Sequence, residues 1–211
     1  MNKIPESGYY NTNKFARIFL ESVREIIGKN GLLSILNYAH LPEYREELPP
    51  DNLEREFEFS NFSMINQALV EIYGERGGRG LSLRVGRTTF DDVLKDFGAF
   101  AGVGEMNFRI LPMQNKIKFG LNAMARVFSE KSDQVHSVEE TDDHFLYIIE
   151  RCPICWGRTS ENHAICYYMV GLLKEGLHWV SGGKEFNITE TKCKSLGDEV
   201  CEFEIQKFPI E

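Results

Sequence analysis

The chain has 211 residues, 42% of them hydrophobic and 12% aromatic, which is enough apolar material for a folded core and too much for a disordered chain. Its formal net charge of −8 argues against a nucleic-acid partner, because phosphate binding needs a basic surface. No apolar run approaches membrane-spanning length and the N-terminus has no apolar signal core, so we expect a cytoplasmic protein without a membrane span.

The N-terminal half is predicted to be helical. Apolar residues keep helical spacing over 15–27, where Asn11 or Thr12 can cap the helix and Gly28 can begin its end. Similar patterns predict helices over 32–40, 61–73, 81–97 and from Pro112 to about residue 128. The run GERGGRG at 74–80 is not interpreted as a phosphate-binding loop, because a helix rather than a strand precedes it.

The last third is predicted to contain strands. A strand is expected over 144–150, with the acidic run EETDD before it as a turn. A helix over 163–177 should end at Ser181-Gly182-Gly183, and strands over 184–190 and 200–207 should form a hairpin. The expected fold class is α+β, with N-terminal helices packed on a small antiparallel sheet. We expect a single domain over 1–211, in which 1–60 form a helical extension or dimerisation part and 61–211 form the core.

All five cysteines lie in the last 60 residues of the chain: Cys152, Cys155, Cys166, Cys193 and Cys201. Cys193 and Cys201 are four residues either side of Gly197, so a hairpin centred there would place them opposite each other. Structural disulfides are rare in a reducing cytoplasm. The alternatives are a metal site, redox chemistry, a disulfide, or thiols packed in the core as small hydrophobic groups.

A buried carboxylate favours the metal. Ile188 and Glu190 face the same side of the predicted strand, and a buried carboxylate is costly unless it is paired or bound to a cation. Cys166 lies on the apolar stripe of the preceding helix. Cys166, Glu190, Cys193 and Cys201 would together make a closed set of four ligands, which suits a structural zinc.

Three segments of the last third resemble a known family. CPICWG at 152–157, the helix HAICYYMVGLLKEGL at 163–177 and ETKCKSLGDEVCEFEI at 190–205 resemble the 4-vinyl reductase domain, a hydrocarbon-binding family. That family shares its fold with small subunits of the TRAPP tethering complex and, more distantly, with haem nitric-oxide-binding domains. The resemblance implies an apolar cavity enclosed between helices and sheet. In aromatic-sensing relatives a zinc is held at the positions that correspond to Cys166, Glu190, Cys193 and Cys201.

Cys152 and Cys155 depart from the pattern of the sensor relatives. They could replace Cys166 or Glu190 as ligands, form a separate redox pair, or be two buried thiols.

The resemblance also predicts ligand-binding positions. The sensor pocket uses a residue one turn after the helix cysteine and a residue two before the strand glutamate, which correspond to Val170 and Ile188. Tyr147 and Phe119 are predicted for the same wall. Because Val170 and Ile188 are apolar, we expect a hydrophobic ligand with few polar anchors.

The leading functional hypothesis is therefore a small-molecule-binding sensor or carrier module for a hydrophobic ligand, with a structural zinc. It would report to a separate output protein, since no output domain is visible in the chain. One alternative is a reductase, or a reductase accessory, acting on a tetrapyrrole vinyl group, although no nucleotide-binding fingerprint supports catalysis. Another is a scaffolding subunit. Because the fold relatives pair through helical faces and the helix over 15–27 is rich in apolar residues, we also predict a homodimer.

Overall fold

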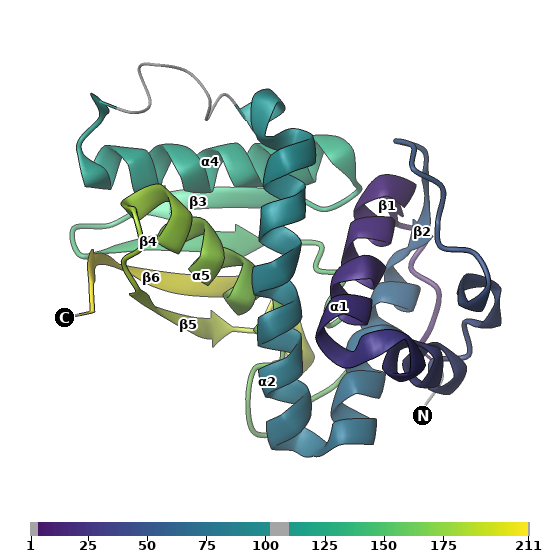
Figure 1. Cartoon of the computed structure of the whole chain (residues 1–211). Coiled ribbons are helices and arrows are strands. Elements are labelled where there is room, and N and C mark those ends of the chain that lie inside the picture. Colours follow the sequence, from purple (N-terminus) through teal and green to yellow (C-terminus); the bar gives the residue numbers. More distant parts are fainter. Residues whose placement is uncertain (1–3, 102–109, 211) are drawn as a thin grey trace.

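The structure is a computed structural model that describes residues 4–101 and 110–210. One long helix, α2, crosses the molecule between two groups of elements (Figure 1). On one side lie α1 and the two-stranded sheet, and on the other lie α4, α5 and the four-stranded sheet. The elements in chain order are β1 (Tyr10–Thr12), α1 (Asn13–Tyr38), η1 (Pro42–Arg45), β2 (Arg55–Glu58), α2 (Phe59–Ala101), α4 (Met113–Lys131), β3 (His136–Glu140), β4 (His144–Ile149), α5 (Tyr167–Ser181), β5 (Phe186–Lys192), η2 (Lys194–Leu196) and β6 (Cys201–Pro209).

Both long N-terminal helices are broken at a glycine. Thr12 caps α1 by accepting a hydrogen bond from the Phe15 amide, and Gly28 interrupts the helix with φ 77°. The predicted break is confirmed, and the chain returns to helix directly after it. In α2 the break is at Gly74, with φ 73°, so the GERGGRG run belongs to the second half of this helix. A Cβ on Gly78 would lie 2.4 Å from the Val70 Cα, so glycine is needed where the two halves of α2 cross.

The four-stranded sheet has the order β3-β4-β6-β5 and every neighbouring pair is antiparallel. Burial alternates along β4 and along the first part of β5, as expected for strands with one face on the core. The strand β3 was not predicted, and Glu139 and Glu140, which we expected in the turn, belong to it. Because β3 is an edge strand with exposed acidic residues, its sequence has little apolar alternation.

A continuous core joins the N-terminal helices to the sheet, with members from Phe15 to Ile205. The rings of Phe19 in α1 and Phe62 in α2 stack with their centroids 4.0 Å apart. The apolar residues of α1 on which the homodimer prediction depended, Phe15, Ile18, Phe19 and Val23, are buried inside the chain itself. The division at residue 60 falls in the first turn of α2.

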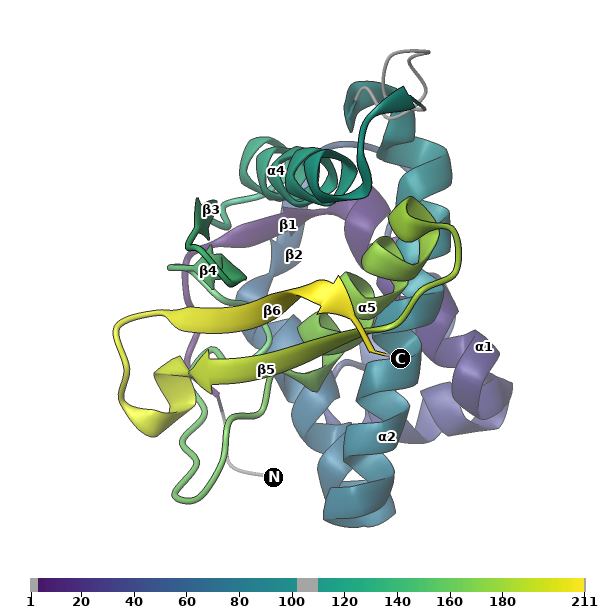
Figure 2. The same cartoon turned by 90° about the vertical axis from the view of Figure 1, so that its left-hand side faces the viewer.

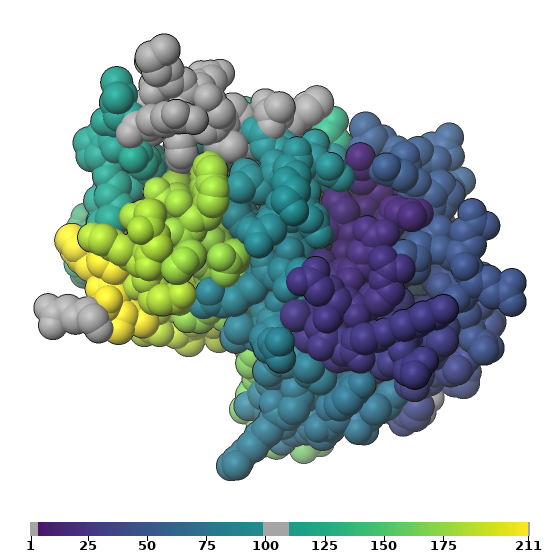
Figure 3. Space-filling model, in the orientation of Figure 1, coloured from purple at the N-terminus to yellow at the C-terminus, as the bar shows by residue number. Residues whose placement is uncertain are grey.

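Helices α2 and α5 cross with their backbones in close approach, and they lie side by side on the face shown in Figure 3. A Cβ on Gly86 would lie 2.0 Å from the Tyr168 carbonyl oxygen, and a Cβ on Gly171 would lie 2.0 Å from the Leu83 carbonyl oxygen. This reciprocal contact leaves no room for any other residue type at either glycine.

The helix predicted over 163–177 begins later than expected, at Tyr167, and Cys166 is its N-cap. The Cys166 amide donates a hydrogen bond to the Glu190 carboxylate, and this contact with β5 replaces a helical start at His163. The helix ends as predicted, with Gly182 in the left-handed conformation. Among the described helices, none combines the length and the apolar character needed to cross a membrane.

Candidate metal centre and apolar cavity

The five cysteines converge from three separate segments. Cys152 and Cys155 lie in the loop after β4, Cys166 caps α5, and Cys193 and Cys201 lie at the tip of the β5–β6 hairpin. Figure 2 shows this hairpin tip and the loop at the same end of the sheet, where the Ser160 amide donates to the Ser195 carbonyl. All five thiols are free and buried.

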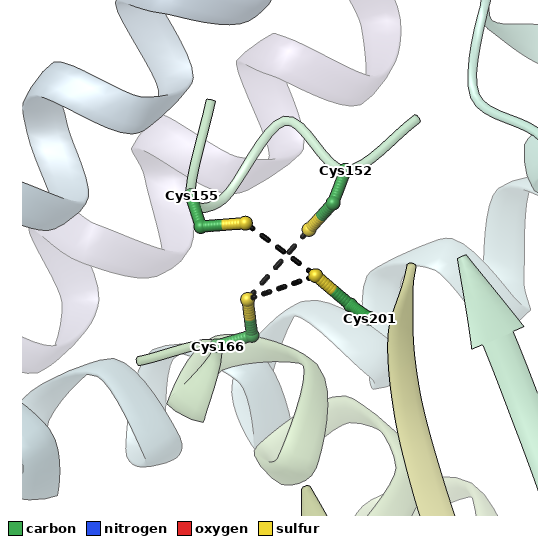
Figure 4. A group of neighbouring side chains, drawn as sticks. All are labelled: Cys152, Cys155, Cys166 and Cys201. Atoms are coloured by element: carbon green, nitrogen blue, oxygen red, sulfur yellow. Dashed lines mark hydrogen bonds between the residues drawn. The ribbon is translucent and has the colours of Figure 1, made fainter. Parts of the chain in front are cut away.

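The sulfur positions fit a tetrahedral metal. Four of the thiols point toward a common centre (Figure 4): Cys152, Cys155, Cys166 and Cys201. The Sγ atom of Cys166 lies 3.7 Å from that of Cys152 and 3.9 Å from those of Cys193 and Cys201, and the Cys155 and Cys201 sulfurs are 3.4 Å apart. A zinc–sulfur bond of about 2.3 Å in tetrahedral geometry separates neighbouring sulfurs by about 3.8 Å. These separations are much longer than the roughly 2.05 Å of a disulfide.

The donor atoms form two overlapping groups of four. One group is Cys166, Glu190, Cys193 and Cys201, the set that hairpin spacing and strand parity predicted, and the structure brings all four together. The other is Cys152, Cys155, Cys166 and Cys201. Within each group the ligand atoms all lie within 4.8 Å of one another. The Cys-x-x-Cys spacing, which is itself common in zinc sites, was the only signal in the sequence that pointed to the second group.

The hairpin tip holds its two cysteines through local backbone geometry. Lys192 pairs with Glu202, so Cys193 and Cys201 occupy the next position of the hairpin, as predicted. The Cys193 amide donates to the Asp198 carboxylate at 2.8 Å, and Gly197 closes the turn with φ 99°. The turn thereby fixes the distance between the two thiols.

Glu190 has an unmet need for a partner. Its Oε2 accepts the Cys166 amide at 2.8 Å, whereas its Oε1 is buried with no hydrogen-bond partner among the described residues. Burial and the neighbouring Cys193 raise the pKa of Glu190 to about 9. A bound cation would supply the missing partner and favour the ionised carboxylate.

The thiols also act on one another. Hydrogen bonds from the surrounding thiols, that of Cys155 first, lower the pKa of Cys193, while Cys152 and Cys155 raise the pKa of Cys201. The guanidinium of Arg158 lies close enough for the Cys166, Cys155 and Cys193 thiols to act on its charge, although burial lowers its pKa. A thiolate-rich centre thus has one positive side chain beside it.

An apolar cavity of about 60 Å³ lies between α2, α4 and α5. It is a separate feature from the cysteine centre, since the two share no residue. Gly176 keeps part of this space open, because a Cβ there would lie 3.0 Å from the Met124 Cε and 3.1 Å from a Phe90 ring carbon. The described lining residues are Phe90, Val93, Leu94, Phe97, Gly98, Ile117, Gly120, Leu121, Ala123, Met124, Val127, Phe128, Leu172, Leu173, Gly176, Leu177, Trp179 and Val180.

The four residues predicted to bind the ligand lie outside this lining. Val170 and Ile188 are buried elsewhere in the core, and Phe119 is 38% exposed on α4. The prediction chose the correct two helices, α4 and α5, but placed the ligand against different faces of them. The lining uses Gly120 on α4 and Leu173 on α5, each a fraction of a turn away.

Tyr147 instead ends a buried chain of hydrogen bonds. The Gln134 amide donates to the Asn11 side-chain oxygen at 2.8 Å, so the Gln134 oxygen faces His136 Nε2, which donates to it at 2.9 Å. His136 Nδ1 is then the acceptor for the Tyr147 hydroxyl at 2.8 Å. Burial lowers the pKa of His136 to about 3, so the ring is neutral in this chain.

Comparison with known families identifies the C-terminal part of the chain. Residues 145–207 match the vinyl-4-reductase domain family, which confirms the resemblance stated from the sequence. A search of curated proteins finds no match.

Solved structures with a similar fold include two H-NOX proteins and a phenol sensor. A doubly substituted H-NOX protein named Tt is 15% identical, with a TM-score of 0.58 over 95% of this chain and 97% of that one. An oxygen-binding H-NOX domain related to soluble guanylate cyclases is 16% identical, with a TM-score of 0.54 over 92% and 94%. The phenol-responsive sensory domain of the transcription activator PoxR is 15% identical, with a TM-score of 0.51 over 72% and 77%. These likenesses confirm the predicted α+β fold class.

The residues of this chain do not fit haem, whose distortion is the subject of another matched structure of the H-NOX family. Haem iron needs an axial ligand such as His, Cys or Tyr. Among the described residues that line the cavity, none is of these types. The cavity volume of about 60 Å³ is also well below the roughly 300–1,000 Å³ typical of pockets for drug-sized ligands.

Proposed function

We propose that this chain, whose residues 145–207 match the vinyl-4-reductase domain, is a sensor or carrier module that binds a small apolar molecule. The observation that carries the proposal is the cavity between α2, α4 and α5, which is lined by apolar side chains and glycines. A structural zinc held by Cys166, Glu190, Cys193 and Cys201 belongs to the same proposal, as do a homodimer and a separate output protein. The apolar face of α1 is occupied in the chain's own core, so the pairing surface would be another one.

The lining restricts the chemistry of the ligand. Because its described side chains carry neither a charge nor a hydroxyl group, binding would come from burial of apolar surface, about 25 cal/mol per Å². A cavity of about 150 Å³ accommodates benzene, so the present volume suits a smaller molecule or requires modest widening. Met124 has a flexible side chain and Trp179 is 41% exposed, so both can move to widen it. We therefore propose a small uncharged hydrocarbon or aromatic molecule.

The zinc would act on this cavity through α5. The helix begins beside Cys166, and its later turns supply Leu173 and Leu177 to the cavity wall. Fixing the start of the helix would therefore fix the orientation of the wall, while the metal itself makes no contact with the ligand. When bound, the metal supplies only a structural cross-link, because four protein ligands leave no open position.

Two valine substitutions on α5 test the location of the site. Val180 lines the cavity and Val170 does not, yet each is 9% exposed and lies on the same helix. Benzene should raise the thermal unfolding temperature of the parent protein and of Val170→Phe, because a ligand that binds only the folded state stabilises it. In Val180→Phe the added ring should fill the cavity and abolish the shift.

The opposite pattern would contradict the proposal. If Val170→Phe loses the benzene response and Val180→Phe keeps it, the ligand site lies where the family resemblance had placed it. If benzene, toluene and phenol all fail to shift the parent protein, the chain is not a receptor for small apolar molecules.

A further inference from the structure

The cysteine centre offers more donors than one metal can use. Five thiols and the Glu190 carboxylate make six donor groups, whereas a tetrahedral zinc takes four. The six are divided into two groups of four that have Cys166 and Cys201 in common. Two tetrahedra that share an edge have this composition, with two shared corners and two separate corners on each side.

The distances agree with a shared edge. The Cys166 and Cys201 sulfurs are 3.9 Å apart, close to the edge of about 3.8 Å expected for zinc thiolates. On one side of this edge Cys152 lies 3.7 Å from Cys166 and Cys155 lies 3.4 Å from Cys201. On the other side Cys193 lies 3.9 Å from Cys166.

We propose that the chain holds a two-metal thiolate centre in which the Cys166 and Cys201 sulfurs bridge two zinc ions. One ion is held in addition by Glu190 and Cys193, and the other by Cys152 and Cys155. The inference rests on the proposed function for the first of these ions and adds the second. Loading releases the thiol protons to solvent, and no electron is transferred.

The segment that supplies the second ion is held firmly in place. Ser63 on α2 donates to the carbonyl groups of Trp156 at 2.8 Å and of Ile154 at 3.3 Å. The Trp156 ring nitrogen donates to the Pro5 carbonyl at 3.1 Å, and Gly157 turns the chain with φ 64°. These contacts come from outside the centre, so they fix Cys152 and Cys155 against the other thiols independently of any metal.

Charge favours two ions over one. Two Zn²⁺ ions carry four positive charges against six negative charges from five thiolates and one carboxylate, and the nearby Arg158 offsets one more. The Glu190 Oε1, buried without a partner among the described residues, points to a cation on that side of the shared edge. With a single ion, two further thiols would stay packed against it without a metal of their own.

The test is metal stoichiometry in the whole chain, purified under reducing conditions and titrated with Zn²⁺ and separately with Co²⁺. Native mass spectrometry should show two equivalents per chain. Cys155→Ser and Cys193→Ser should each reduce this to one, because each removes a ligand from one ion only. Ser195→Ala is the matched control, since its hydroxyl lies 3.0 Å from the Cys193 sulfur but is not a donor in either group. With Co²⁺, the paramagnetic signal should grow to one equivalent and then fall as the second bridged ion couples to the first.

Other results separate this inference from the function it rests on. One equivalent that survives Cys155→Ser and is lost in Cys193→Ser overturns the second ion and leaves the proposed zinc site standing. One equivalent with the reverse dependence overturns both ligand assignments in favour of the four-cysteine group. Stoichiometric iron with acid-labile sulfide, or no metal at all, overturns both proposals. Because the stoichiometry of the parent chain decides the matter, a variant that fails to fold does not leave it open.

Discussion

The cysteine centre and the apolar cavity are built on the same helix in opposite ways. The centre gathers a few specific donors at the N-cap of α5, and hairpin and loop backbones hold each of them. The cavity lies along the later turns, where many interchangeable apolar side chains from three helices contribute a little each. Loss of one donor should therefore abolish the centre, whereas changes to the cavity should have graded effects.

The largest effect should come from a shared donor. Cys201→Ser removes a ligand from both donor groups, so we expect loss of all bound metal and of several kcal/mol of unfolding free energy. Metal analysis and denaturant unfolding would measure both, with Ser195→Ala as the control. A variant that keeps both its metal and its stability would show that the centre is not a structural site.

The helix crossing that joins the two regions comes next. Gly171→Ala places a Cβ 2.0 Å from the Leu83 carbonyl oxygen, so the α2 and α5 backbones must separate, at a cost of about 3 kcal/mol or more. Gly120→Ala is the control, because its nearest neighbour would be a Val180 methyl at 3.7 Å. Thermal unfolding should separate the two variants clearly, and equal unfolding temperatures would contradict the close approach of the helices.

Acid should act through a group that belongs to neither region. His136 has a pKa of about 3 in the folded chain and 6.5 in a model compound, so the unfolded chain binds the extra proton between these values. Stability should therefore fall as the pH falls from 6.5 toward 3, by about 1.4 kcal/mol per pH unit. Urea unfolding of metal-free protein at several pH values measures this slope. His136→Gln should flatten it, and an unchanged slope would mean that His136 is not the group responsible.

The smallest effect should have opposite signs for folding and binding. Gly120→Ala should raise stability by up to about 1 kcal/mol, because alanine favours helix over glycine. The added methyl occupies cavity space, so benzene affinity should fall about fourfold, equivalent to about 0.8 kcal/mol. Calorimetry on this variant and on Gly80→Ala, an exposed helical glycine away from the cavity, would show whether the loss is specific.

Local geometry explains which parts of the site could be predicted from the sequence. The hairpin that pairs Cys193 with Cys201, and the strand parity that directs Glu190 inward, depend on residues close together in the chain. The approach of Cys152 depends on α2 and on the N-terminal segment, which hold its loop from far away in the sequence. No spacing rule contains that information.

The cavity was harder to predict because it is defined by what the core leaves unfilled. Both Val170 and Leu173 are apolar and buried on α5, and only the packing of α2 and α4 decides which of them faces the cavity. The start of α5 was also predicted too early, since the hydrogen bond from Cys166 to Glu190 is a tertiary contact. The unpredicted β3 has a similar cause, because an edge strand is identified by its partner rather than by its own sequence.

The glycine crossing gives α5 the mechanics of a lever. Gly171 is the pivot against α2, and the short arm toward Cys166 is clamped at the cysteine centre. The long arm runs about 15 Å from Gly171 to Ser181 along the cavity, so a 1 Å displacement at its tip is a rotation of only about 4°. Near the tip, Arg87 on α2 contacts Glu175 and Glu185 in partly exposed ion pairs, which resist such a rotation only weakly. Swelling of the cavity would thus be read out at the turn between α5 and β5, with the clamped end stationary.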